Sequence, residues 1–328
     1  MSEFDIIREV FAPLTASAPG AFNLVDDAAL LATQNLVVTK DLMVAGVHFL
    51  PKDPLDLVAR KLIRVNLSDL AAKGVKPLGY FLGCVWPQNV KRADIELFAR
   101  GLGEDQEQFR VALYGGDTTV HGAKGAPLTL SATFFGTPPK QGMTPRSGAS
   151  LGDDLYVSGT IGDAGLGLAA LKKELRFTTV DRASLAMRYH LPEPRLSLGA
   201  ALAGLATAAI DVSDGLIADA GHLARACGLR AEIEAVAVPR SAGAGSWVAA
   251  QDNRWRALAT LAGFGDDYEI LFAAPPALRR SVTVAAKASR TAVSRIGQLT
   301  RGEGVFFLDE SGSPIAVPQG GYDHFKKA

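Results

Sequence analysis

The chain has few cysteines, no excess of charge of one sign and no long apolar run. Cys84 and Cys227 are its only cysteines, and they form no CxxC pair, so we expect two buried, reduced thiols rather than a zinc site. Lys plus Arg and Asp plus Glu number 34 each, which leaves no net field to attract nucleic acid. No segment approaches the roughly 20 apolar residues of a membrane span, and the N-terminus has no basic-then-apolar leader. We therefore expect a cytoplasmic protein that binds neither nucleic acid nor membrane.

Several motifs of nucleotide-binding and hydrolytic enzymes are also absent. No Gly-x-x-x-x-Gly-Lys-Ser/Thr segment occurs, which excludes a Walker-type phosphate loop. Residues 165–170 have the pattern Gly-x-Gly-x-x-Ala, but no strand ending in an acid follows about 20 residues later, so close helix packing explains these glycines better. The five histidines show no HExxH or triad spacing. The sequence thus offers neither a nucleophile signature nor a general base.

Length and composition predict two domains. A chain of 328 residues exceeds what one hydrophobic core usually organises. Segment 137–153 is rich in Pro, Gly and Ser, as linkers are. We therefore expect an N-terminal domain at 1–138, a linker at 139–150 and a C-terminal domain at 151–328.

Apolar periodicity predicts an α/β fold with mixed, α+β character in the N-terminal sheet. The expected N-terminal elements are helices at 3–11, 54–74 and 93–109 and strands at 35–41, 78–86, 111–117 and 128–136. The expected C-terminal elements are a strand, turn and helix within 154–175, a helix, strand, turn and helix within 198–228, strands at 230–236, 268–274 and 294–299, and helices at 254–262 and 276–288.

Two segments of the chain repeat a Ser-Asp pattern, "VNLSD" at 65–69 and "IDVSD" at 210–214. One aspartate alone favours a cap or a turn. Asp41, Asp117 and Asp211, however, each directly follow an apolar strand-like run, and sites are commonly built at strand ends. Carboxylates that converge raise one another's pKa unless a hard cation such as Mg²⁺ neutralises them. Convergence of these acids therefore predicts a divalent metal.

The helix expected after the second motif explains only part of it. Ser213 suits the N-cap of that helix, whereas Asp211 lies before the cap and has no helical role. Asp219, further along the same helix, is expected to be a solvated or packing acid. The remaining signals are ambiguous: Gly116 before Asp117 can approach a phosphate or sit in an inert loop, and Arg146 can clamp a phosphate or be solvated.

Eight motifs in a fixed order are more specific than any one of them. They are "VDDAALL", "VVTKDLMVAGVHF", "VNLSDLAAKGVKP", "YGGDTT", "TPRSGASLGD", "IDVSDGLIADAGHL", "GDDYEIL" and "GYDHF". Together they span nearly the whole chain, which resembles the thiamine-monophosphate kinase family of the aminoimidazole ribonucleotide synthetase-like superfamily. The resemblance implies a two-domain fold, an N-terminal sheet that pairs across a homodimer, and ATP-dependent phosphorylation of thiamine monophosphate to thiamine diphosphate.

The resemblance also implies the residues of the site. A phosphate acceptor is mostly dianionic at pH 7, since its second pKa is about 6, so direct transfer assisted by metal needs no catalytic base. The implied ligands of several Mg²⁺ ions are Asp27, Thr39, Asp41, Asp69, Asp117, Asp211 and Asp214. The implied ATP contacts are Gly116, Asp117, Arg146 and Ser213, and the implied substrate contacts are His48, Asp266 and Tyr322.

The chain departs from the family pattern at three positions. Val25 stands where the family has Gly, Lys40 where it has Ser or Thr, and Asp266 where it has Glu. Lys40 could replace one metal or bind a phosphate, or do neither if it points to the other face of its strand. Two alternatives remain open: another ATP-dependent enzyme of the superfamily, such as a selenophosphate synthetase, or a non-catalytic dimer that binds nucleotide and metal. A selenophosphate synthetase lacks support, because those enzymes usually carry a reactive cysteine or selenocysteine near the N-terminus and no cysteine precedes Cys84 here.

Overall fold

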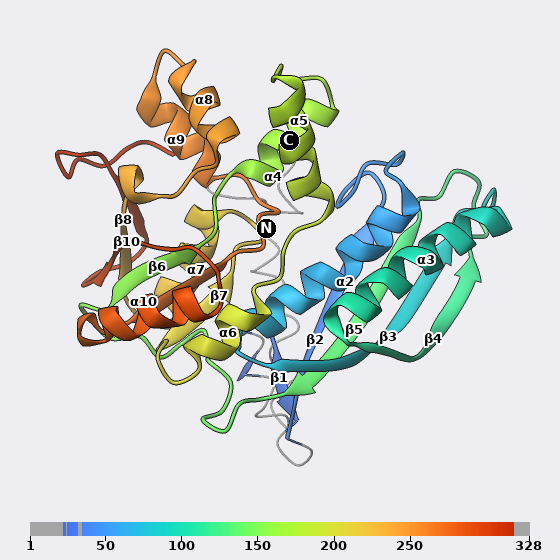
Figure 1. Cartoon of the computed structure of the whole chain (residues 1–328), viewed down its shortest axis with the longest axis horizontal. Coiled ribbons are helices and arrows are strands. Elements are labelled where there is room, and N and C mark those ends of the chain that lie inside the picture. The colour runs from blue at the N-terminus through green and yellow to red at the C-terminus, as the bar shows by residue number, and fades with distance from the viewer. Residues whose placement is uncertain (1–21, 24, 32–34, 318–328) are drawn as a thin grey trace.

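The computed structural model describes residues 22–23, 25–31 and 35–317, which form two β-sheets with helices packed on them (Figure 1). This arrangement confirms the predicted mixed α/β fold. The helix expected at 3–11 and the residue Tyr322 lie outside the described residues. No helix in the described ranges is long and apolar enough to cross a membrane.

The first sheet has the strand order β1-β2-β5-β3-β4. Only its β3 and β4 pair in parallel, because the intervening helix α3 carries the chain back to the start of the sheet. Helices α2 and α3 pack on one face of this sheet (Figure 1). The strands are β1 (Ala29–Leu31), β2 (Leu36–Val44), β3 (Lys76–Trp86), β4 (Ala112–Val120) and β5 (Thr129–Thr137), and the helices are α2 (Leu55–Ala72) and α3 (Arg92–Phe109).

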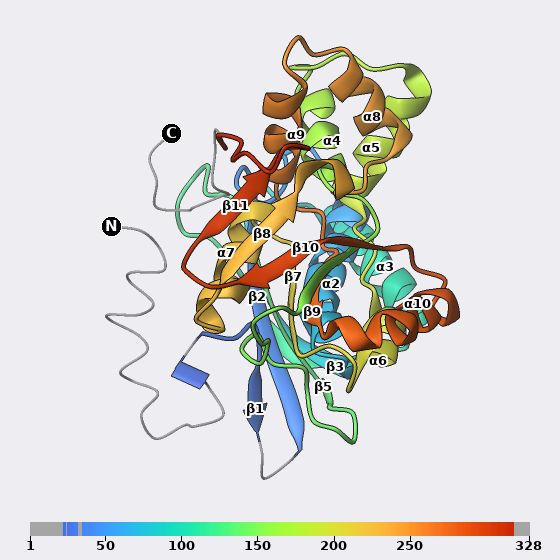
Figure 2. The same ribbon diagram turned by 90° about the vertical axis from the view of Figure 1, so that its left-hand side faces the viewer.

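The second sheet has the order β11-β8-β10-β6-β9-β7. Helices α4, α5, α8 and α9 gather at one end of it (Figure 2). Its strands are β6 (Asp154–Ser158), β7 (Ala208–Asp211), β8 (Arg230–Glu234), β9 (Ile270–Ala274), β10 (Val293–Thr300) and β11 (Val305–Leu308). Its helices are α4 (Asp163–Leu171), α5 (Thr179–His190), α6 (Leu196–Leu202), α7 (Leu216–Ala226), α8 (Ala242–Ala249), α9 (Arg254–Ala262) and α10 (Arg279–Ala288), with short 3₁₀ turns at Ala235–Ala237 and Pro276–Leu278.

Helix α2 lies between the two sheets. It contacts strands β2 and β5 of the first sheet, strands β7 and β9 of the second sheet, and helix α6. Of its 18 residues, 13 are buried, as expected for a helix that is covered on all sides. Leu62 belongs to the core of the first sheet, while Ala71 belongs to a core built with Ala209 and Phe272. The end of α2 is therefore the place where residues from both sheets can meet.

Two expectations about strand ends were wrong. Asp41 and Asp117 do not end their strands, because β2 runs on to Val44 and β4 runs on to Val120. Backbone pairing with β5 and with β3 continues past each acid, and a polar side chain does not interrupt a ladder whose hydrogen bonds come from the main chain. Only Asp211 ends its strand.

Two smaller expectations have mixed outcomes. Both cysteines are free thiols, but only Cys84 is buried; Cys227 is half-buried. The glycine pattern at 165–170 serves helix packing as predicted, since a Cβ on Gly167 would lie 2.1 Å from the carbonyl oxygen of Leu185.

Candidate active site

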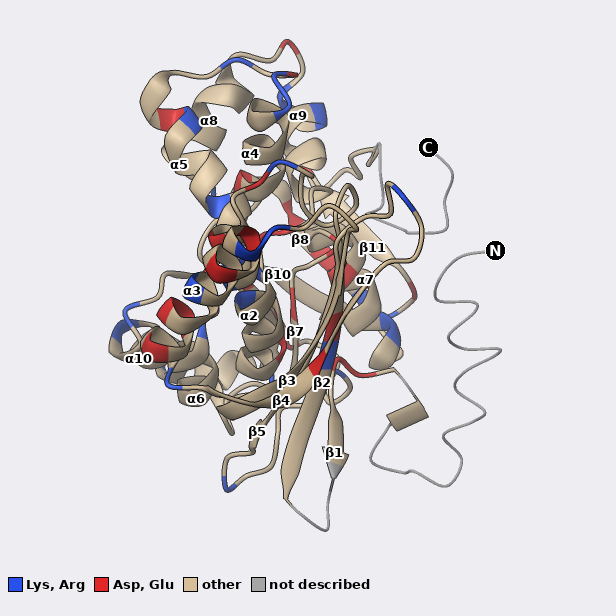
Figure 3. Ribbon diagram, turned by 90° about the vertical axis from the view of Figure 1, so that its right-hand side faces the viewer, with Lys and Arg blue, Asp and Glu red and all other residues tan. Residues whose placement is uncertain are grey.

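Carboxylates from three elements converge at the end of α2. Asp27 precedes β1, Asp69 lies in the last turn of α2 and Asp211 ends β7. One oxygen of each lies within 4.8 Å of the others. Figure 3 shows acidic segments gathered where β2 approaches the second sheet. The fold thus brings together three of the predicted metal ligands, drawn from both sheets.

Strand β2 adds a hydroxyl and a fourth carboxylate. Thr39 and Asp41 are two residues apart, so their side chains lie on the same face of the strand. The buried Thr39 hydroxyl donates to Asp69 Oδ2 at 2.5 Å. Burial, followed by the charges of Asp211 and Asp41, raises the pKa of Asp69 well above its usual value. Burial likewise raises the pKa of Asp41 and of Asp211 to about 6.

A buried lysine and a half-buried arginine contact these acids. Lys73 follows α2 and is fully buried; its Nζ ion-pairs with Asp26 Oδ1 at 2.9 Å and Asp27 Oδ2 at 2.8 Å. The same ammonium donates to the carbonyl oxygen of Ala209 at 2.8 Å. Arg146 contacts Asp27 through its guanidinium, and its backbone N–H donates to Asp26 Oδ2 at 2.9 Å. Sequence reasoning assigned no role to Asp26 and missed Lys73, because a lysine at the end of a helix is commonly solvated.

The other acids fit a hard cation. In the part of the chain that the structure describes, neither Asp69 nor Asp211 forms an ion pair, and each receives a hydroxyl hydrogen bond, from Thr39 and from Ser68. Carboxylate and hydroxyl oxygens are the ligands that Mg²⁺ prefers. Carboxyl groups with raised pKa values also gain most from a cation that stabilises their charged form. The donor set around Asp69 and Asp211 therefore fits Mg²⁺.

A second group of possible ligands lies at the start of α7, where oxygens of Asp214 and Asp219 and a ring nitrogen of His222 lie within 4.8 Å of one another. Asp219 is buried, and its Oδ2 accepts the N–H groups of Asp214 and Gly215 at 3.1 Å each. One expectation is corrected: the N-cap of α7 is Gly215 rather than Ser213. Of the two alternatives for Asp219, its burial favours the packing acid over the solvated one. The Asp219 carboxylate takes over the capping of these amides, so Ser213 is not needed for it.

The structure does not bring Gly116 and Asp117 into either group. They lie within β4, whose side chains are mostly exposed. A Cβ on Gly116 would lie 1.9 Å from the carbonyl oxygen of Leu82, so close pairing with β3 already requires a glycine there. Asp117 Oδ1 accepts the N–H of Thr118 at 2.8 Å.

Two departures from the family pattern, Val25 and Lys40, involve no backbone strain, whereas the third, Asp266, adopts a left-handed φ of 69°. Lys40 is exposed and its Nζ contacts Ser131 Oγ on β5, so its side chain lies on the face opposite to Thr39 and Asp41. Val25 does not adopt the left-handed conformation that favours glycine. Of the alternatives for Lys40, this geometry favours the one in which it neither replaces a metal ion nor binds a phosphate.

The predicted substrate residues are joined by a lysine that the sequence reasoning missed. Lys61 of α2 is almost fully buried, and its Nζ lies 2.8 Å from Asp266 Oδ2. It also donates to the carbonyl oxygen of His48 at 3.1 Å and lies 4.1 Å from the ring centroid of Tyr189. His48 and Asp266 are thereby held on either side of one cation, while Tyr322 lies outside the described residues.

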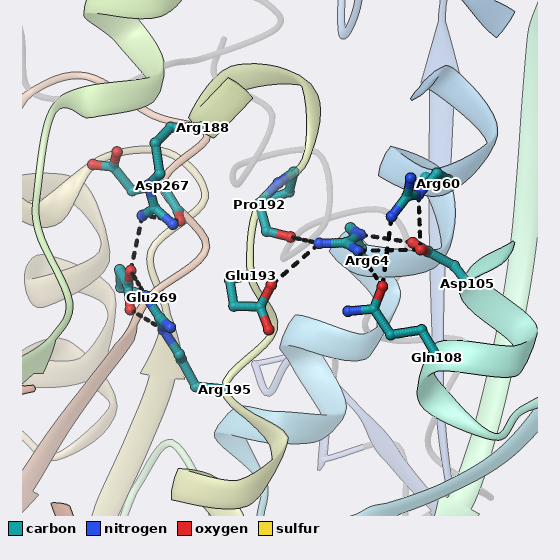
Figure 4. Close-up of polar contacts among 10 residues, drawn as sticks. All are labelled: Arg60, Arg64, Asp105, Gln108, Arg188, Pro192, Glu193, Arg195, Asp267 and Glu269. Carbon is teal, nitrogen blue, oxygen red and sulfur yellow. Dashed lines mark hydrogen bonds and ion pairs between the residues drawn. The ribbon is translucent and has the colours of Figure 1, made fainter. Parts of the chain in front are cut away.

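Residues next to Asp266 serve the framework of the site (Figure 4). Glu269 accepts from Arg188 at 2.8 Å and from Arg195 at 2.6 and 2.7 Å. Asp267 accepts the N–H groups of Gly162 and Ala164. On the other side of Figure 4, buried Arg64 of α2 pairs with Asp105 of α3 at 2.6 Å. These networks fix the loop that carries Asp266 and the helix that carries Lys61.

Comparison with known proteins defines the class. Residues 25–137 match the family described as AIR synthase related protein, N-terminal domain, and residues 151–309 match the corresponding C-terminal domain. The chain is thus an AIR synthase related protein with both domains of that family.

Individual relatives within this family identify the subfamily to which the chain belongs. A thiamine-monophosphate kinase of Caulobacter vibrioides is 48% identical over 307 residues, covering 93% of this chain and 86% of the relative. The thiamine-monophosphate kinase of Escherichia coli strain K12 is 38% identical over 331 residues, which cover 98% of this chain and 98% of the relative. The solved structure of AaThiL complexed with AMPPCP and TMP is 28% identical, has a TM-score of 0.83, and matches 99% of this chain and 97% of its own. The chain belongs to the thiamine-monophosphate kinase family.

Proposed function

We propose that the protein transfers the γ-phosphoryl group of ATP to the phosphate of thiamine monophosphate, giving thiamine diphosphate and ADP. The observation that carries this proposal is the convergence of Asp27, Asp69 and Asp211 from two sheets at the end of one helix. The names of the relatives support the reaction, and the ligands of the AaThiL structure support the pair of substrates.

The chemistry requires neutralisation of charge rather than a base. Mg²⁺, when bound, supplies positive charge next to the oxygens of the transferred phosphoryl group. Asp69 and Asp211 would hold it, with Asp41 and Asp27 beside them. The Thr39 and Ser68 hydroxyls orient the two ligands by donating to Asp69 and Asp211. The phosphate acceptor is mostly dianionic at pH 7 and loses no proton to the protein, which accounts for the absence of a base.

The remaining site residues are assigned by the same proposal. His48 and Asp266 bind thiamine monophosphate on either side of Lys61, and Tyr322 stacks on its cationic ring. Arg146 and Ser213 contact ATP, and Asp214 is a further metal ligand. Gly116 and Asp117 are assigned to ATP, and Asp117 also to metal, from the resemblance alone, because both lie outside the two groups of acids.

The partner in solution is proposed to be a second copy of the chain. Among the described residues, edge strand β4 has one side without a paired strand, and such edges are normally covered. Large apolar side chains of the first sheet are exposed beside it, and a patch of this kind marks an interface. These side chains are Leu42, Phe81, Leu113, Tyr114 and Val120.

The test is to incubate the purified protein with ATP, Mg²⁺ and thiamine monophosphate and to separate the products by chromatography. We expect equimolar thiamine diphosphate and ADP, and an Asp211→Asn variant that loses most turnover at limiting Mg²⁺. ATP binding without any thiamine diphosphate would favour the non-catalytic dimer. ATP consumption with selenide, but not with thiamine monophosphate, would favour a selenophosphate synthetase.

A further inference from the structure

We propose that Lys73 is a resident cation that takes the place of one metal ion, so that Asp26 and Asp27 are neutralised by the protein itself. The remaining carboxylates, Asp69 and Asp211, are left to bind Mg²⁺. The inference rests on the proposed metal site and concerns how many ions this chain needs there.

The ammonium group of Lys73 lies between three acceptors. It donates a hydrogen bond to the carbonyl oxygen of Ala209 at 2.8 Å. It also forms ion pairs with Asp26 Oδ1 at 2.9 Å and Asp27 Oδ2 at 2.8 Å, two buried oxygens that have no hydrogen-bond partner within the described residues. These partners come from the segment before β1 and from β7. One fixed charge therefore joins both sheets, as a bound cation would.

The backbone of Lys73 is also held in place. Its N–H donates to the carbonyl oxygen of Asp69 at 3.2 Å, and its carbonyl oxygen accepts the N–H of Thr144 at 3.1 Å. With no exposed surface, the side chain has no room to leave the acids. A buried charge of this kind is tolerated because it is paired on two sides.

Asp27 is occupied by cations on both of its oxygens. Lys73 lies against Oδ2 and Arg146 against Oδ1. A metal ion at Asp27 would have to compete with the positive charges of Lys73 and Arg146. Among the described residues, Asp69 and Asp211 form no ion pair with a lysine or arginine. The geometry therefore divides the acids into two sets. Asp26 and Asp27 are neutralised by Lys73 and Arg146, and Asp69 and Asp211 are available to bind metal.

Lys40 provides the contrast. It is the lysine next to a predicted ligand in sequence, but its Nζ contacts Ser131 on the exposed face of the first sheet. Lys40→Met and Lys73→Met remove the same charge with the same replacement, so they form a matched pair.

The experiment counts bound metal without substrates, using Mn²⁺ titrations followed by electron paramagnetic resonance and calorimetry. We expect Lys73→Met to bind one more Mn²⁺ per chain than the wild type, and Lys40→Met to bind the wild-type number. We also expect Mn²⁺ to raise the Tm of Lys73→Met more than that of the wild type. An unchanged count in Lys73→Met, or an increase in Lys40→Met instead, overturns the proposal.

A variant that removes both charges covers the case in which Lys73→Met does not fold. Asp26→Asn combined with Lys73→Met lowers the number of unpaired acids, so it is expected to fold and to bind the wild-type number of ions. If this double variant also binds one more ion than the wild type, the extra ion does not depend on the carboxylate that Lys73 neutralises at Asp26, and the proposal fails. None of these measurements needs turnover, so the outcome is independent of whether thiamine diphosphate is formed.

Discussion

Ser68 Oγ donates a hydrogen bond to Asp211 Oδ2 at 2.7 Å. The serine belongs to the first Ser-Asp motif, on α2, and the aspartate belongs to the second, at the end of β7. The two motifs that look alike in sequence therefore touch each other, and each supplies a different part of one site.

Removal of the Ser68 hydroxyl should weaken metal binding. Residues that orient a ligand typically contribute about 10- to 100-fold to metal affinity, so Ser68→Ala is expected to lower Mg²⁺ affinity by roughly that factor. The measurement is the Mg²⁺ dependence of product formation together with direct Mn²⁺ titration. Ser289→Ala, which removes a hydroxyl at the end of α10, is the control. Equal affinities in both variants would show that the Ser68 contact is dispensable.

Replacement of Lys61 should affect one substrate selectively. Lys61→Met removes the cation between His48 and Asp266, and loss of a hydrogen bond to a charged group costs about 1.5–3 kcal/mol. The KM for thiamine monophosphate should therefore rise roughly tenfold or more, with little change in the KM for ATP. Steady-state kinetics with each substrate varied in turn checks this, with the exposed Lys76→Met as control. A parallel rise in both KM values would contradict the assignment.

Stability should fall with rising pH because of Asp267. Burial is the main cause that raises the pKa of this carboxyl from 3.8 to about 8. The folded state thus binds the proton more tightly than the unfolded chain, so this contribution is complete below about pH 4 and is lost as pH rises to about 8. The upper limit of this contribution is on the order of 6 kcal/mol, since the pKa rises from 3.8 to about 8 and one pKa unit is about 1.4 kcal/mol.

The pH prediction is checked by urea unfolding of the wild type and of Asp267→Asn between pH 4 and pH 8. The wild type should lose free energy of unfolding relative to this variant over that range. The exposed Asp252→Asn should follow the wild type. Parallel curves for the wild type and Asp267→Asn would mean that Asp267 is charged throughout.

A charge on β4 should separate the proposed dimer. Tyr114 is 60% exposed on this edge strand, and burial of a new carboxylate in an interface is unfavourable. We expect Tyr114→Glu to give monomers in light scattering at concentrations where the wild type is dimeric. Val284→Glu alters an equally exposed residue on α10 and should leave the mass unchanged. A monomeric wild type, or a dimeric Tyr114→Glu, would refute the pairing.

Local pattern predicted the long elements well. Helix α2 was expected at 54–74 and spans Leu55–Ala72, because its apolar residues recur at helical spacing. The short elements β1, β11 and α8 were missed. Strands β1 and β11 are only three and four residues long, and the sequence of α8 is too uniformly small and apolar to show a periodic face.

The candidate site could be predicted only in part. The motifs pointed to Asp27, Asp69 and Asp211, because each lies in a recognisable segment. Lys73 and Lys61 could not be found in the same way, since their roles depend on partners far away in the chain, such as Ala209 and Asp266. A buried lysine and a solvated lysine look alike in sequence until the fold places acceptors around one of them.

The central position of α2 has a consequence for how the molecule unfolds. The helix contributes Leu62 to the core of the first sheet and Ala71 to a core of the second part. If either sheet unfolds, α2 loses part of its buried apolar contacts. The other sheet, which packs on the same helix, is then destabilised as well. The two halves should therefore unfold in a single calorimetric transition, and a cut in the connecting segment 139–150 should yield fragments that become soluble and folded only when mixed.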